Sequence, residues 1–277
     1  MKKKNLSTIA LVLVFFVGLS VLLYPTLSDY WNSLHQSQAI ATYADSVAEM
    51  DEQDYEEMWN AAQEYNEKLF ETGHGLGLKQ KEKKEYNNLL NVSGTGIMSY
   101  IELPKIDCSL PIYHGTDEGA LQIAIGHLEG SSLPVGGKST HCVLSGHRGL
   151  PSARLFTDLD QMEEGDVFVL NVLGRKLAYE VDQIKVVLPD EMSDLEIVQG
   201  KDLCTLVTCT PYGINTHRLL VRGHRTKYIE ETVVRVQKEA EKKETGIWLL
   251  AGGGAVFLII IIIVVVKRRR KRRNLQR

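Results

Sequence analysis

The sequence predicts a mainly-β domain that follows a long helix and is flanked by two membrane-spanning helices. Three observations support this fold class. Short β-branched runs alternate with turn residues from Gly96 onward, residues 38–70 carry apolar side chains at helical spacing, and an uncharged apolar stretch lies near each end. Many short strands with no long helices between them favour an antiparallel barrel or sandwich.

The two apolar stretches are long enough to cross a membrane. Residues 6–23 are uncharged and follow Lys2–Lys4, and residues 246–266 are uncharged and precede an unbroken basic run. Each has the length that a hydrocarbon core of roughly 30 Å requires. A signal peptide usually has an apolar run of about 7–15 residues and an A-x-A cleavage site. The first stretch is longer and lacks that site, so an uncleaved anchor is favoured; the basic run argues against a buried core helix for the second.

The charges beside the two spans predict the orientation of the chain. Basic flanks stay in the cytoplasm, so both termini are expected there and the chain between the spans outside the cell, at the cell membrane. The tails carry 11 of the 32 Lys and Arg residues, which leaves 21 against all 35 Asp and Glu residues in the rest of the chain. An acidic exterior argues against nucleic-acid binding, and the basic C-terminal tail suits contact with anionic lipid.

The chain between the spans divides into a helical part and a strand-rich part. Residues 38–70 are predicted to form one long helix, and residues 116–128 one short crossing helix. After Arg225 a charged helical stretch leads to the second span. Strands are predicted in the β-branched runs at residues 97–106, 141–147, 166–172, 177–189, 203–209 and 217–224.

Three of the four cysteines have the surroundings of structural residues. Cys108, Cys142 and Cys204 lie in apolar, strand-like runs, where a free cysteine behaves as a small hydrophobic side chain. An extracellular domain could join them in disulfides, but this setting favours free thiols. The chain has no C-x-x-C and no H-x-x-x-H spacing, so no metal site is expected.

Cys209 has a different setting, at the end of a predicted strand just before Pro211 and Gly213. This position predicts a partly exposed thiol at the rim of the β domain. A thiol becomes a nucleophile when a nearby cation lowers its pKa. The hairpin that follows brings either His217 or Arg218 opposite Cys209, because side chains alternate in direction along a strand.

The two kinds of cation suit different roles. Arginine has no proton to exchange at neutral pH and suits an oxyanion, whereas general acid–base work requires a histidine. His147, His217 and His224 are candidates on spacing alone, and a cysteine near a histidine could also be an unrelated pair of core residues.

Several motifs together resemble those of the sortases. They are TLVTC with an arginine nine residues after the cysteine, SGHRG upstream, and YIELPKID, LPIYHGT, GHLEGSSLPVGG, LFTDLD and NTHRLLVRGHR. The resemblance covers residues 86–226. Together with the N-terminal helix and the C-terminal span, the layout resembles that of class C, the pilin-polymerising sortases. It implies a closed eight-stranded sortase β-barrel with short helices, and no cofactor or metal.

The resemblance also assigns roles at the site. It implies that Cys209 is the acyl-forming nucleophile, His147 the general acid/base and Arg218 the oxyanion stabiliser, with Thr208 lining the substrate groove. His217 and His224 then have structural or surface roles.

The implied function is that of a cysteine transpeptidase. It would cleave LPxTG-like sorting signals of pilin or surface proteins through a thioester and pass the acyl group to an amine, a pilin lysine or a peptidoglycan precursor. Two alternatives remain: a housekeeping sortase that anchors proteins to peptidoglycan, and a non-enzymatic surface scaffold. A scaffold would not need all three site residues, and all three are present.

One segment departs from the class C pattern. Members usually carry a lid with an Asp-Pro-aromatic motif before the barrel, but residues 71–96 contain neither Asp nor Pro. His74 is the candidate ring for that place. The five glycines and several lysines of the segment predict a mobile linker and an accessible Cys209.

The predicted organisation has six parts. They are an N-terminal membrane anchor (1–24), an extracellular helical region with a lid-like linker (25–95), the catalytic barrel (96–226), a polar stalk (227–245), a C-terminal transmembrane helix (246–266) and a basic cytoplasmic tail (267–277).

Overall fold

The structure is a computed structural model that describes residues 2–73, 78, 80–231, 233–234 and 236–238. The chain divides into two units, residues 1–229 and residues 230–277. All the helices and strands named below belong to the first unit. The predicted second span and basic tail lie outside the described residues.

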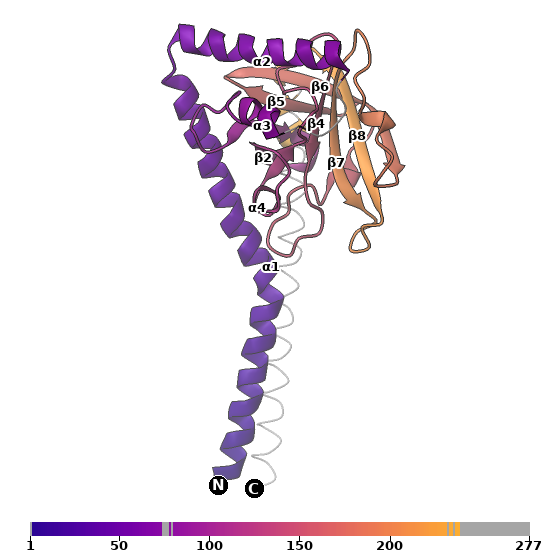
Figure 1. The fold of residues 1–277 in the computed structure, drawn as a ribbon. Coiled ribbons are helices and arrows are strands. Elements are labelled where there is room, and N and C mark those ends of the chain that lie inside the picture. The colour runs from indigo at the N-terminus through magenta and orange to yellow at the C-terminus, as the bar shows by residue number, and fades with distance from the viewer. Residues whose placement is uncertain (1, 74–77, 79, 232, 235, 239–277) are drawn as a thin grey trace. The chain divides into compact units, whose positions relative to one another are not determined.

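Eight strands close into a barrel in the order β1-β2-β3-β4-β7-β8-β6-β5. Figure 1 shows β7 and β8 side by side in this barrel. The strands are β1 (Ile97–Leu103), β2 (Cys108–His114), β3 (Ile125–His127), β4 (Thr140–Ser145), β5 (Val167–Val172), β6 (Arg175–Val187), β7 (Asp202–Thr210) and β8 (His217–Thr226). The closed eight-stranded barrel is confirmed.

The expectation of a purely antiparallel sheet is wrong. β2 pairs with β3 and β4 pairs with β7 in parallel. A parallel pair needs a crossover connection rather than a hairpin. The chain supplies one through α4 (Glu118–Leu121), between β2 and β3, and one through β5 and β6, between β4 and β7. The second crossover places β4 against β7 although the two strands are far apart in the sequence.

Two helix predictions are wrong. The single helix at 38–70 is two, α1 (Lys2–Ala48) and α2 (Glu52–Thr72), because Asp51 caps α2 by accepting a hydrogen bond from the Asp54 N–H (2.8 Å). This cap starts a new helix within the apolar pattern. The predicted helix at 116–128 is α4 followed by β3, whose backbone groups pair with β2 on one side and β4 on the other.

The N-terminal part of α1 has the properties of a membrane anchor. The stretch Leu13–Ala48 is long and apolar enough to cross a bilayer, by length and composition. Large apolar side chains such as Phe15, Val21 and Leu22 are exposed along it. A helix with exposed apolar side chains of this kind fits a membrane anchor.

Both long helices are hydrogen-bonded to the barrel. The Tyr43 hydroxyl of α1 donates to the Met98 carbonyl of β1 (3.0 Å) and accepts from the Leu173 N–H (2.9 Å). From α2, the buried Asn66 amide donates to the Leu133 carbonyl (3.1 Å) and accepts from its N–H (2.7 Å). These bonds satisfy polar groups that burial would otherwise penalise.

The described residues 82–96 of the linker include side chains that pack against the barrel, contrary to the expectation of a mobile segment. α3 (Gln80–Tyr86) ends at a fully buried tyrosine, and Leu90 is also buried. The Tyr86 hydroxyl contacts His127 Nδ1 (2.8 Å) and accepts from the Gly115 N–H (3.1 Å). The glycines and lysines of the segment predict mobility, but the burial of the apolar side chains of Tyr86 and Leu90 holds it against the barrel. His74 lies outside the described residues.

Candidate active site

Cys209 lies one residue before the end of β7, on the outer face of the barrel wall. Along β7, Cys204 and Leu206 pack in the main core, whereas Val207 packs on the opposite side in a second cluster with Val143 and Leu220. Because alternate residues of a strand share a face, Cys209 lies on the face of Val207, and it is partly exposed. The rim position expected from the sequence is therefore observed.

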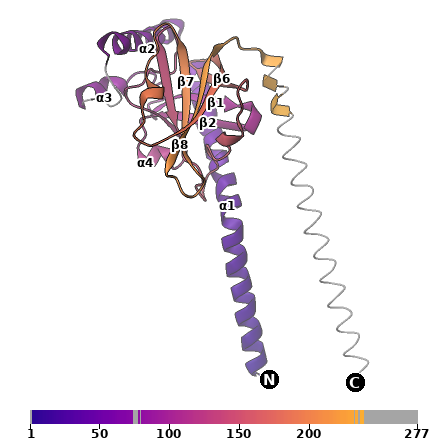
Figure 2. The same ribbon diagram turned by 90° about the vertical axis from the view of Figure 1, so that its right-hand side faces the viewer.

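The β7–β8 hairpin places Arg218 directly opposite Cys209. Their Cα positions are partners in the antiparallel register, and His217 is paired with Thr210 instead. Figure 2 shows the ribbons of the two paired strands, β7 and β8. This register decides between the two residues that the sequence left open. The Arg218 guanidinium donates from Nη1 to the carbonyls of His217 (3.1 Å) and Asn215 (3.4 Å).

His147 follows the end of β4, which runs parallel to β7. Ser145 is the register partner of Val207, and the Gly146 N–H continues the ladder by donating to the Val207 carbonyl (3.0 Å). Continued by two further pairs, this register brings His147 alongside Cys209. Position 146 requires glycine, because a Cβ there would lie 2.7 Å from a ring carbon of Phe156.

The His147 side chain is 30% exposed, but its Nε2 atom is itself buried and has no hydrogen-bond partner among the described residues. Glu118 of α4 lies 4.0 Å from Nε2, which is an ion-pair distance rather than a hydrogen bond. This pair can form only when the imidazole is protonated. A ring nitrogen without a hydrogen bond to the protein can receive or deliver a proton, as a general acid/base must.

Thr208 points away from the face of Cys209. Its side chain is buried, at 2% exposure, and its hydroxyl donates to the Gly146 carbonyl (2.8 Å). A direct contact between this hydroxyl and a substrate would require that bond to break. The place of Thr208 in a substrate groove remains a prediction.

The other candidate histidines are not gathered at Cys209. His224 is the register partner of Leu203, near the start of β7, and its Nδ1 is 3.7 Å from Asp182. His217 contacts the neighbouring Thr216 hydroxyl through Nδ1 (2.9 Å).

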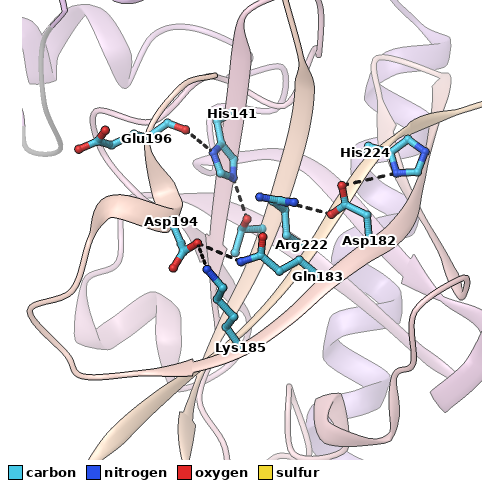
Figure 3. A network of polar contacts seen from close by, with 9 residues as sticks. His141, Asp182, Gln183, Lys185, Asp194, Glu196, Arg222 and His224 are labelled. Carbon is cyan, nitrogen blue, oxygen red and sulfur yellow. Dashed lines mark hydrogen bonds and ion pairs between the residues drawn. The ribbon is translucent and has the colours of Figure 1, made fainter. Parts of the chain in front are cut away.

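The segment between β6 and β7 is held over the outer face by a polar network (Figure 3). His141 of β4 donates from Nδ1 to the Glu196 carbonyl (2.8 Å), and its Nε2 lies 2.7 Å from the Thr205 hydroxyl. Burial lowers the pKa of His141 and favours its neutral form. Lys185 donates to Asp194 in the same segment (2.6 Å), and this hydrogen bond lowers the pKa of that carboxyl.

All four cysteines are free thiols. Cys142 and Cys204 are buried, and Cys108 is partly buried with a pKa that burial raises to about 12. These surroundings agree with structural roles for the three. Among the residues that the structure describes, no three His, Cys, Asp or Glu side chains are grouped as metal ligands would be.

Two residues beside the site were missed by sequence reasoning, Arg148 and Thr210. They bond to one another through Arg148 Nη1 and the Thr210 hydroxyl (3.4 Å). The only signal for them was adjacency, since each directly follows a candidate catalytic residue.

The strand registers therefore place a cysteine, an arginine and a histidine at one rim of a closed β-barrel. Such a set can perform nucleophilic acyl chemistry, with sulfur as nucleophile, the imidazole as proton carrier and the guanidinium at the oxyanion.

Comparisons with known proteins agree with this reading. The Sortase domain model matches residues 101–226. The crystal structure of sortase C1 from Streptococcus agalactiae is 56% identical, with a TM-score of 0.67, covering 69% of this chain and 100% of that chain. A sortase C from Streptococcus pneumoniae is 46% identical, with a TM-score of 0.63, covering 69% and 97%. Sortase D from Bacillus subtilis is 32% identical over 128 residues, which are 45% of this chain and 62% of that protein. The chain belongs to the sortase family, and these structural neighbours are class C members.

Proposed function

We propose that this chain is a membrane-anchored cysteine transpeptidase that cleaves LPxTG-like sorting signals and joins the acyl group to a pilin lysine. The observation that carries the proposal is the register pairing of Cys209 with Arg218 at the barrel rim, with His147 at the end of the adjacent strand β4. Family membership supports the reaction class.

The proposed reaction has two half-reactions. The Cys209 thiol gives its proton to His147 as the sulfur attacks the Thr–Gly carbonyl of the sorting signal, and Arg218 donates hydrogen bonds to the tetrahedral oxyanion. His147 protonates the departing glycine amine, which leaves a thioester on Cys209. The acceptor amine then attacks the thioester and gives a proton to His147; the C–S bond breaks, and His147 returns the proton to the departing sulfur, which restores the thiol. No cofactor takes part in these steps.

The choice of a pilin lysine as acceptor rests on the neighbours. The structure of the S. pneumoniae sortase C is reported to give insights into pilin substrate specificity. A second neighbour, 45% identical to this chain, is the sortase C1 of GBS Pilus Island 1. Identity to Sortase A of S. agalactiae is only 25%. The competing acceptor is a peptidoglycan precursor, as in housekeeping anchoring of surface proteins.

The proposed location is the cell membrane, with both termini in the cytoplasm and the barrel outside. The apolar helix near the N-terminus supports an anchor, and the charges beside the two apolar stretches support the orientation.

Mass spectrometry of reaction products tests the proposal. The full chain in detergent is mixed with an LPxTG peptide and two competing acceptors, a lysine-bearing pilin peptide and a peptidoglycan-precursor amine. The expected result is a conjugate to the lysine peptide that is absent with Cys209→Ala. A conjugate mainly to the peptidoglycan amine would indicate anchoring, release of free acid alone would indicate a protease, and no cleavage would contradict the proposal.

A further inference from the structure

Arg148 is a second cation beside the site, and the sequence assigned it no role. Its side chain is only 9% exposed, although arginine is mostly found at the surface. Nη1 donates to the Thr210 hydroxyl (3.4 Å), and Nη2 donates to Asp160. A buried charge is tolerated when it is paired and hydrogen-bonded. These bonds join the loop after β4 to the end of β7 and to the short helix η2 (Leu159–Gln161).

The bond to Thr210 connects the neighbours of the two candidate catalytic residues. Arg148 directly follows His147, and Thr210 directly follows Cys209. The imidazole and the thiol are carried by two segments that have no covalent connection near the site. A bond one residue beyond each of them limits how far these segments can separate.

A second bond lies on the other side of the same pair. Thr208, which precedes Cys209, donates its hydroxyl to the carbonyl of Gly146, which precedes His147 (2.8 Å). Each candidate catalytic residue is therefore bracketed by two contacts between β7 and the end of β4.

The surroundings of Arg148 hold its side chain in place. Its guanidinium carbon lies 5.9 Å from the centroid of the Tyr212 ring, within reach of a cation–π contact. Gly149, with φ +77°, lies under the same ring, because a Cβ there would be 3.0 Å from a Tyr212 ring carbon. The Gly149 N–H donates to the Thr157 hydroxyl (3.2 Å), and this bond joins the two ends of the segment 149–157 that follows Arg148.

We propose that Arg148 is a positioning residue that fixes the His147 imidazole relative to the Cys209 thiol by anchoring the β4 loop to Thr210. The inference rests on the proposed function and adds a residue to it. Misplacing a catalytic group by about 1 Å can cost about 10²-fold in rate. Arg148 itself bonds Thr210 and Asp160, and the charged group at ion-pair distance from the imidazole is Glu118 of α4.

Steady-state kinetics of the full chain in detergent provide the first test. Arg148→Gln is expected to lower kcat for LPxTG-peptide cleavage about 10- to 100-fold, with KM within about threefold, because substrate contacts are kept. Thr210→Val should lower kcat about 3- to 10-fold, and Thr210→Ser, which keeps the hydroxyl, should restore it. Combining Arg148→Gln with Thr210→Val should add little to Arg148→Gln alone.

The matched control is Arg175→Gln. Arg175 also bonds two partners, Tyr55 and Glu56 of α2, but it starts β6 and touches neither segment of the site. Its variant should keep the wild-type kcat. If it lost activity as Arg148→Gln does, the effect would be general destabilisation and the inference would be overturned.

The pH dependence of Cys209 alkylation gives a readout that needs no turnover. The profile of Arg148→Gln is expected to move from that of wild type toward that of His147→Asn, since the imidazole would no longer be held beside the thiol. Identical profiles for wild type and His147→Asn would overturn the inference, because the imidazole would then have no effect on the thiol and there would be nothing for Arg148 to position. If Arg148→Gln does not fold, the comparison of Thr210→Val with Thr210→Ser decides by the same criteria.

Failure of the inference and failure of the proposed function give different results. Wild-type turnover together with an unchanged kcat and alkylation profile in Arg148→Gln overturns the positioning role alone. Absence of LPxTG cleavage by wild type contradicts the proposed function, and the alkylation profiles still decide the role of Arg148.

Discussion

Thiol labelling of the native chain should modify Cys209 well before any other cysteine. The structure supplies a separate reason for each slow site. Cys108 has a pKa that burial raises to about 12. At pH 8 its thiolate fraction would be about 10⁻⁴, against roughly a quarter for an ordinary thiol with a pKa of about 8.5. Since the thiolate is the reactive form, its labelling should be slower by roughly 10³-fold.

Cys142 and Cys204 should be labelled slowly because reagents cannot reach them, whatever the pKa of each thiol. Burial alone would raise the pKa of Cys142, but hydrogen bonds with Cys204 and His127 outweigh this and lower it. Cys142 is only 2% exposed, so a reagent cannot reach it in the folded chain. Burial raises the pKa of Cys204, which is also inaccessible. Both should be labelled only when the barrel opens.

The assay is timed alkylation of the full chain in detergent at pH 8, followed by peptide mass spectrometry that scores each cysteine. A denatured sample, in which all four should react, controls for peptide detection. Cys209→Ala should lose the fast phase, and Cys108→Ala should not. Labelling of Cys108 within about tenfold of Cys209 would refute the burial argument, and labelling of Cys204 before Cys209 would refute the assignment of the nucleophile.

Three further predictions concern the oxyanion, pH and topology. Arg218→Lys keeps the charge but loses the planar fork, so kcat should fall about 10²-fold, while His217→Ala should stay near wild type; equal rates for wild type and Arg218→Ala would contradict this role. Burial lowers the pKa of His141, so as pH falls through about 6.5 the imidazole is protonated in the unfolded chain before it is protonated in the folded chain, and the folded state loses stability. The Tm of His141→Gln should therefore fall less between pH 7.5 and 5.5 than the Tm of wild type. An equal fall in the two proteins would refute this. Protease added to wall-free cells should remove residues 25–245 and protect both basic tails, and digestion of the C-terminal tail would overturn the proposed orientation.

The sequence by itself determined those features that depend on neighbouring residues. Apolar stretches beside basic runs predict spans, and the apolar end of α1 fits that prediction. Alternation along 203–209 placed Cys209 at a rim on the face of Val207, as observed. The motifs around Cys209 and His147 identified the family, because they combine several residue types at fixed spacing.

The tertiary structure decided everything that depends on pairing between distant segments. Alternation allowed either His217 or Arg218 opposite Cys209, and only the hairpin register selected Arg218. His147 reaches the site because β4 and β7 pair in parallel across a long crossover, which no local pattern encodes. The helix break at Asp51 depended on a single capping bond within an apolar repeat. Local periodicity records which face of a segment is buried, whereas the partner that buries it is set by packing of the whole chain.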